Sequence, residues 1–101
     1  MIKIYKTQNG SKIYVNKDEQ VVLHLAENPT TGYIWEVLDY SKTNINFLKS
    51  EYTPNLDSEG AAGVRKFYFK IIGIGVSTII ISLCQPWNHE SIEQFSISIV
   101  S

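Results

Sequence analysis

The sequence predicts an all-β domain, built as a two-sheet antiparallel β-sandwich of about eight short strands. The first observation is composition, because the chain contains 14 Ile, 7 Val and 6 Thr but only 3 Ala and 6 Leu. β-branched side chains lose rotamer freedom in helices and pack well on a pleated sheet. The second observation is that apolar and polar residues alternate in short runs, and the third is that turn residues separate these runs at close spacing.

Size, charge and cysteine content limit the kinds of protein that this chain can be. Its 101 residues and 11.5 kDa predict a single domain over residues 1–101 and exclude a two-domain enzyme with a cleft between its domains. A net charge of -1 produces no positive potential that would attract phosphate groups, so nucleic acid is not an expected partner. The hydrophobic fraction of 44% provides an ordered core. Cys84 is the one cysteine, so no internal disulfide can form.

Three strands are expected in the first part of the chain. Ile2–Lys6 and Lys12–Val15 lie on either side of Asn9-Gly10, a pair suited to a tight turn because both residues tolerate positive φ. Val21–Ala26 follows, and its odd-numbered residues are apolar and should face the core. These core-facing residues are Val21, Leu23 and Leu25.

Five further strands complete the prediction: Tyr33–Leu38, Ile45–Tyr52, Arg65–Ile71, Val76–Cys84 and Phe95–Ile99. Helix is the alternative for Val76–Cys84, but β-branching and short length favour a strand. The number of strands and their spacing are typical of an immunoglobulin-like sandwich. A closed β-barrel is the alternative architecture. Because strands in a sandwich alternate in direction, every second connection falls at the same end. The loops before Tyr33, before Arg65 and after Cys84 should therefore lie together.

The first of these loops carries the sharpest motif of the chain, Asn28-Pro29-Thr30-Thr31-Gly32-Tyr33. Pro29 fixes its own φ and favours an extended Asn28, while Gly32 permits a conformation closed to other residues, so the loop should be stiff. The two threonines offer hydroxyl groups at its apex. By shape alone, an ordinary tight connection between strands is the alternative interpretation.

Together with three other features, this motif resembles the chagasin family of cysteine protease inhibitors. The features are Trp35 after the motif, a glycine-rich loop before the alternating aromatic residues, and Pro86-Trp87 before the last strand. The resemblance covers essentially the whole chain and includes the Asn9-Gly10 turn and the spacing from Gly60 to Phe67.

The resemblance implies a function and a set of contact residues. Chagasin-like proteins are immunoglobulin-like sandwiches that insert three adjacent loops into the cleft of papain-like cysteine proteases and block it reversibly and competitively. By position, Asn28–Tyr33 would supply the central loop over the enzyme's catalytic cysteine and histidine. The loop on the non-primed side would be Gly60-Ala61-Ala62-Gly63. The loop on the primed side would be Gln85-Pro86-Trp87, with the indole packed on an aromatic wall.

General physical chemistry agrees with these roles and marks two departures from the family. An indole held beside Pro86 buries a large area at small entropic cost, and small residues let two backbones approach each other. The family usually has Arg where this chain has Gln85, so charge-assisted hydrogen bonds are lost. The family also prefers Gly where Ala62 stands, and a methyl group there would reshape the loop if the position requires positive φ.

Other conspicuous residues are expected to be structural. Trp35 lies on a strand and is predicted to be a core residue. Cys84 with His24 or His89 offers the elements of a nucleophilic site, but a cysteine in an apolar run is more often a small buried hydrophobe. His24 is expected to be solvated on the polar face of its strand. These residues are not spaced along the chain as metal ligands usually are, so we expect no metal. We also expect no catalytic residue and no cofactor.

The prediction is thus a protein inhibitor that is a monomer when free and whose partners are papain-like, cathepsin-like cysteine proteases. No signal segment or apolar span is visible, so we expect no membrane partner and a cytoplasmic location, or a secreted or vesicular one if a leader was removed. The alternatives are an immunoglobulin-like adhesion or scaffolding domain and a carbohydrate-binding module with Trp87 and Tyr33 as stacking platforms.

Overall fold

The structure is a computed structural model of the chain that describes residues 1–56, 62–88 and 90–101. Its strands are β1 (Ile2–Tyr5), β2 (Lys12–Tyr14), β3 (Gln20–Glu27), β4 (Ile34–Tyr40), β5 (Ile45–Thr53), β6 (Gly63–Ile71), β7 (Val76–Cys84) and β8 (Ser91–Val100). Two short 3-10 segments interrupt the strands, η1 (Lys6–Gln8) and η2 (Pro29–Thr31). The predicted all-β fold is confirmed, including a strand rather than a helix after Gly75.

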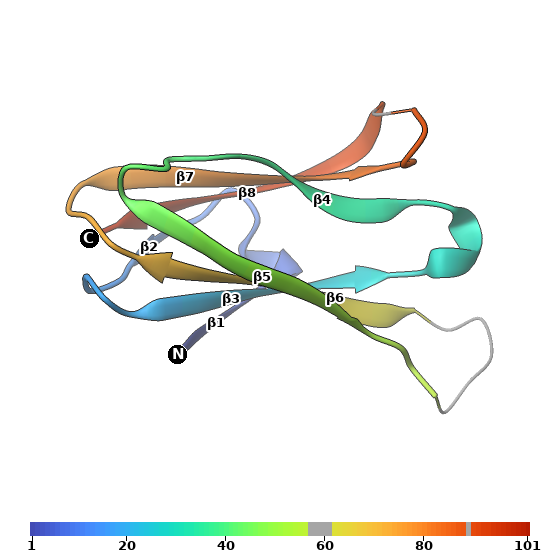
Figure 1. Cartoon of the computed structure of the whole chain (residues 1–101), viewed down its shortest axis with the longest axis horizontal. Coiled ribbons are helices and arrows are strands. Elements are labelled where there is room, and N and C mark those ends of the chain that lie inside the picture. Colours follow the sequence, from blue (N-terminus) through green and yellow to red (C-terminus); the bar gives the residue numbers. More distant parts are fainter. Residues whose placement is uncertain (57–61, 89) are drawn as a thin grey trace.

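The strands form two four-stranded sheets that lie face to face (Figure 1). Sheet A has the order β1-β3-β6-β5, and sheet B has the order β2-β8-β7-β4. Since no strand belongs to both sheets, the fold is the predicted sandwich and not a closed β-barrel.

The edge pairs β1–β3 and β2–β8 are parallel, whereas the prediction was of antiparallel sheets. The other pairs among the described strands are antiparallel, as expected. The reason is that β1 and β2 do not form a hairpin with each other, although a tight turn separates them. The chain crosses from sheet A to sheet B through η1 and Asn9-Gly10, so each short strand joins the edge of a different sheet. Gly10 has φ +79°, and its N–H donates to Ser96 O at 2.7 Å, which attaches the crossing to β8.

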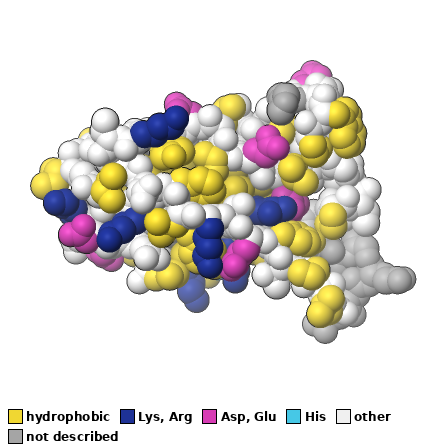
Figure 2. Space-filling model, in the orientation of Figure 1, with side chains coloured by type: hydrophobic (Ala, Val, Ile, Leu, Met, Phe, Trp, Pro, Cys, Tyr) yellow, Lys and Arg dark blue, Asp and Glu magenta, His cyan; other side chains and the backbone are white. Residues whose placement is uncertain are grey.

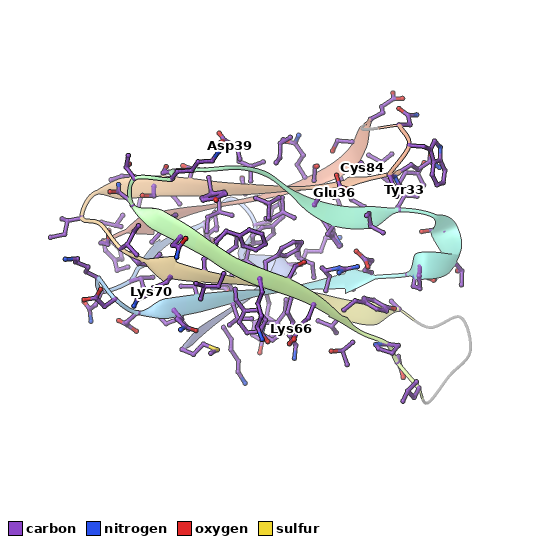
Figure 3. All side chains as sticks on the ribbon, viewed as in Figure 1. Tyr33, Glu36, Asp39, Lys66, Lys70 and Cys84 are labelled. Carbon is purple, nitrogen blue, oxygen red and sulfur yellow. The ribbon has the colours of Figure 1, made fainter. Side chains whose placement is uncertain are left out.

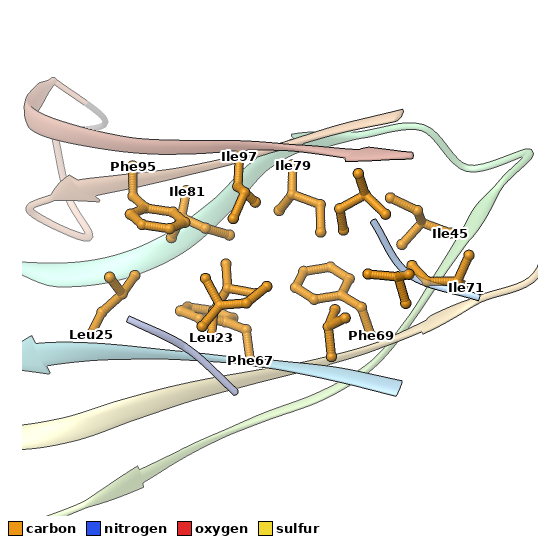
Figure 4. Close-up of a cluster of buried hydrophobic side chains, with 14 of the residues drawn as sticks. Leu23, Leu25, Ile45, Phe67, Phe69, Ile71, Ile79, Ile81, Phe95 and Ile97 are labelled. Carbon is orange, nitrogen blue, oxygen red and sulfur yellow. The ribbon is translucent and has the colours of Figure 1, made fainter. Parts of the chain in front are cut away.

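The core fills the space between the sheets, as Figure 4 shows. Sheet A contributes Leu23 and Leu25 from β3 and Phe67 from β6, all buried, and sheet B contributes residues such as Ile81 and Phe95. The predicted core face of β3 is therefore confirmed. Consecutive side chains of a strand point to opposite faces, so this alternation fixes which residues at the strand ends point inward.

The last strand is longer than its hydrophobic pattern predicts. β8 begins at Ser91 rather than Phe95, because Ser91 and Glu93 pair with the end of β7. Backbone pairing requires no apolar side chain, so polar residues conceal the start of this strand. In the part of the chain that the structure describes, no helix is long and apolar enough to cross a membrane.

Candidate functional site

Three connections have their strand ends at one end of the sandwich (Figure 1). They join β3 to β4, β5 to β6, and β7 to β8. Strand pairing places their ends together, because Glu27 pairs with Gly63, Thr53 with Val64, and Cys84 with Ile34. The three loops predicted to share one end therefore do start from neighbouring strand ends. We call the β3–β4 connection, Asn28–Tyr33, the central loop.

The central loop is held by hydrogen bonds between its own residues. The Asn28 side chain accepts from the Thr30 N–H at 3.1 Å and from the Thr30 hydroxyl at 2.7 Å. The Thr31 hydroxyl donates to Asn28 O at 2.8 Å and accepts from the Tyr33 N–H at 3.3 Å. These hydrogen bonds support the predicted stiffness, and both threonine hydroxyls donate to Asn28 within the loop. Asn28 acts as the N-cap of η2, with Pro29 at its first position.

Gly32 ends η2 in the left-handed region, with φ +79° and ψ 0°. This is the conformation, unfavourable for other residues, that the glycine was predicted to permit. Gly32 also lies against the β7–β8 connection, since a Cβ atom added to Gly32 would stand 3.3 Å from Cη2 of Trp87. The indole therefore lies beside the central loop. Two of the three predicted contact segments are in this way brought into contact.

Trp87 projects from a tight turn and is 72% exposed. The turn is closed by the Asn88 N–H, which donates to Gln85 O at 3.1 Å, and Pro86 occupies the position where its fixed φ suits a turn. Gln85 is half-buried and Pro86 is exposed. A large aromatic side chain is therefore presented to solvent from a constrained backbone.

The third predicted segment is described only in part. Gly60 and Ala61 lie outside the described residues, while Ala62 is exposed and Gly63 is buried at the start of β6. A Cβ atom on Gly63 would stand 2.4 Å from Thr53 O and 2.5 Å from the Tyr52 hydroxyl. The absence of a side chain at Gly63 is thus explained by packing within sheet A.

A partly buried ion pair, which the sequence analysis missed, lies at the strand ends from which the loops start. Glu27 is 3% exposed, and its Oε2 accepts from Arg65 Nη2 at 2.8 Å while Oε1 accepts from Arg65 Nε at 3.3 Å. Oε1 also accepts from the Trp35 N–H at 2.7 Å. A sequence signal did exist. Glu27 continues the inward-facing odd positions of β3, and Arg65 continues those of β6, so two opposite charges fall on core-facing positions of paired strands.

Two aromatic residues extend this cluster. The Trp35 indole N–H donates to Ala26 O at 2.8 Å, and the side chain is 3% exposed, so the predicted core role of Trp35 is confirmed. The Tyr52 hydroxyl donates to Glu27 O at 3.3 Å, and the Arg65 guanidinium lies 5.3 Å from the centre of the Tyr52 ring. We call Glu27, Arg65, Trp35 and Tyr52 the stem cluster.

An apolar groove of about 360 Å³ adjoins the central loop. Tyr33 from the loop, Leu83 from β7 and Ile92 from β8 contribute to its walls, and Ile92 is 58% exposed. Figure 2 shows hydrophobic side chains on the surface at this end of the molecule. Together with Trp87, the groove gives the loop end an apolar component beside its polar central loop.

The alternative sites do not gain support from the geometry. Burial raises the pKa of the Cys84 thiol, and Glu36, whose carboxylate lies 3.4 Å from the sulfur, raises it further (Figure 3). A thiol kept protonated is a poor nucleophile. His24 is half-buried and stacked on Tyr5 rather than solvated, because the edge strand β1 lies beside it. His89 lies outside the described residues, and within those described no cluster of possible metal ligands occurs.

Comparison with known proteins gives consistent matches in sequence and fold. The model of the chagasin family peptidase inhibitor I42 matches residues 14–99. Chagasin from Trypanosoma cruzi is 30% identical over 104 residues, covering 94% of this chain and 93% of chagasin. The cysteine protease inhibitor EhICP2 from Entamoeba histolytica has a similar fold, with a TM-score of 0.84 at 18% identity over 98% of this chain and 92% of that one. PbICP-C, solved in complex with falcipain-2, has a TM-score of 0.68 at 15% identity, over 97% of this chain and 86% of that one.

Proposed function

This chain belongs to the chagasin family of cysteine protease inhibitors, and from that premise we propose that it blocks papain-like proteases reversibly and competitively. Its relatives are named as inhibitors, and the chain is accordingly an inhibitor rather than an enzyme. In the proposed complex a single copy places its three neighbouring loops in the active-site cleft. The observation that carries the proposal is the contact of the exposed Trp87 with Gly32, which joins an aromatic anchor to a stiff loop.

The central loop would cover the catalytic cysteine and histidine without being cleaved. A protease attacks a carbonyl carbon in an extended substrate backbone that is held at the right distance and angle. Here the backbone turns back on itself, and the carbonyl oxygens of Asn28 and Pro29 accept hydrogen bonds from Thr31 and Gly32 at 3.2 Å each. Such a loop would fill the cleft, and its 3-10 segment Pro29–Thr31 would present no extended peptide bond to the nucleophile. Because the loop is already ordered, little conformational entropy would be lost on binding.

Trp87 would supply the largest single contact on the primed side. Its indole is mostly solvated in the free chain, so association with an aromatic wall would remove a large apolar area from water. Pro86 and the turn hydrogen bond restrict the backbone that carries it. Rigid aromatic residues of this kind are common among the residues that dominate binding energy.

The remaining predicted contacts would be weaker. Gln85 offers a neutral amide where the family usually has Arg, so its hydrogen bonds to the enzyme would lack the assistance of a charge. On the non-primed side, Ala62 is exposed and available for contact, whereas Gly63 is buried. A protein of the same fold, PbICP-C, binds falcipain-2, which supports a papain-like partner.

The experiment that tests this proposal is titration of papain and of a cathepsin with the purified chain. We expect inhibition that decreases with increasing substrate concentration and that is reversed by dilution. Mass spectrometry of the inhibitor after prolonged incubation with enzyme should show an intact chain. No inhibition of several papain-like enzymes at micromolar excess, or a chain cut within Asn28–Gly32, would contradict the proposal.

A further inference from the structure

The stem cluster connects the starting points of two of the three loops. The side chain of Glu27, the residue before the central loop, accepts from the Trp35 N–H just after that loop. The same carboxylate binds Arg65, close to the start of β6, and the Glu27 carbonyl accepts from Tyr52, close to the end of β5. A single residue therefore contacts strands β4, β5 and β6, and these include both sheets.

The third loop is linked to this arrangement through the central loop. Trp87 lies against Gly32, and Gly32 is hydrogen-bonded within the turn that begins at Asn28, next to Glu27. A shift of Glu27 would therefore move the central loop relative to the ends of β5 and β6 and would also change the packing of the Trp87 indole beside Gly32.

The physical character of the ion pair suggests a role other than stability. Glu27 and Arg65 have side-chain exposures of 1% and 21%, so both charges lose much of their hydration on folding. For such buried pairs the loss of hydration often cancels the attraction, and apolar residues of similar size stabilise a protein equally well. What a guanidinium and a carboxylate supply, and apolar side chains do not, is a planar two-point contact with a fixed orientation.

We propose that the Glu27–Arg65 pair is a positioning device, which sets the central loop relative to the adjoining ends of β5 and β6 and so determines how long a protease stays bound. This inference rests on the proposed function. The pair does not touch the enzyme; it acts through the loops that it holds in place.

The test compares three variants with the wild-type chain. Glu27→Gln keeps the size of the side chain and an oxygen acceptor for Trp35 but removes its charge, and Arg65→Lys keeps the charge but removes the fork. Glu51→Gln is the matched control, because it also removes an ion pair of sheet A, with Lys49 at 3.7 Å, on the outer face. Dissociation rates from papain are measured by stopped flow, and unfolding is measured by urea titration.

We expect Glu27→Gln to raise the dissociation rate about tenfold, Arg65→Lys to raise it less, and Glu51→Gln to leave it unchanged. A pair that only stabilised the fold would shift the urea midpoint but not the dissociation rate of the folded chain. Equal dissociation rates for the wild type, Glu27→Gln and Arg65→Lys would overturn the inference.

A second measurement separates this inference from the proposed function, since it needs no protease. NMR relaxation of the free chain should show larger motion of the Thr30, Thr31 and Gly32 amides in Glu27→Gln and Arg65→Lys than in Glu51→Gln. Unchanged amides would refute the positioning role even if the wild type inhibits papain. Changed amides in a chain that inhibits no protease would refute the proposed function and leave the positioning of the loop established.

Discussion

The central loop and the β7–β8 connection lie side by side but are built in opposite ways. The central loop forms hydrogen bonds between its own polar groups, through Asn28, Thr30 and Thr31, and its Tyr33 contributes to the wall of the apolar groove. The β7–β8 connection contains a turn in which the Asn88 N–H donates to Gln85 O, and it leaves Trp87 72% exposed. In the proposed complex, the central loop would therefore contribute a fixed shape and the β7–β8 connection would contribute buried apolar area.

The largest expected effect comes from removing that area. Trp87→Ala should weaken inhibition by about 2 kcal/mol or more, because an indole in a well-packed pocket is a frequent hot spot. The unfolding midpoint should stay the same, since the side chain is mostly solvated in the free chain. Inhibition constants for papain and urea unfolding are the two measurements. Ile74→Ala is the control, because Ile74 is 78% exposed in the turn between β6 and β7. Equal loss in both variants would remove Trp87 from the interface.

The next effect tests whether the two connections depend on each other. Gly32→Ala should lower the free energy of unfolding by about 1 kcal/mol, because alanine is strained at positive φ. It should also weaken inhibition, since the new Cβ would stand 3.3 Å from Trp87. Gly10→Ala is a matched control, because Gly10 has the same φ of +79° and no atom within 4 Å of an added Cβ. Weaker inhibition only in Gly32→Ala, together with a smaller loss when position 87 is already alanine, would support the coupling. Weaker inhibition in both would argue against it.

A smaller effect concerns the stiffness of the central loop alone. Pro29→Gly should raise the dissociation rate a few-fold, because glycine adds conformations to the unbound loop at a cost of about 0.4–1 kcal/mol on ordering. Stopped-flow dissociation from papain measures this change. Identical rates for Pro29→Gly and the wild type would show that stiffness at this position does not limit the lifetime of the complex.

The smallest effect lies outside both connections, on the outer face of sheet A. Partial burial of His24, together with the charges of Lys66 and Lys3, lowers its pKa below the ordinary value of 6.5. The unfolded chain therefore binds this proton at higher pH than the folded chain, so stability falls as the pH drops below about 6.5. Urea unfolding of wild type and His24→Gln at several pH values measures this contribution. The variant should lose part of the decrease, and an identical decrease in both chains would exclude His24 as its source.

Much of the loop end could be predicted from local sequence. The Asn-Pro-Thr-Thr-Gly string predicted a stiff turn, and η2 with Gly32 at positive φ has that form. Pro86 and Trp87 in a polar segment predicted an exposed aromatic residue, and Trp87 is exposed. These features depend on the φ preferences and polarity of neighbouring residues, which act over a few positions of the chain.

The stem cluster was within reach of the sequence but was not found. Strict alternation placed Glu27 and Arg65 on the inward faces of their strands, where opposite charges predict a pair. The sequence placed the two threonine hydroxyls at the apex of the loop but did not show that both donate within it. Hydrogen-bond partners inside a turn depend on its exact path, which composition and spacing do not specify.

The sequence by itself determined the strands, the faces that they bury and the family, because side-chain branching, alternation and a contiguous motif are local properties. Only the tertiary structure decided that β1 and β2 join different sheets, that Glu27 binds Arg65, and that Trp87 lies against Gly32. These outcomes depend on which distant segments pack together. Such pairing is set by the burial of the whole core rather than by any one stretch of the chain.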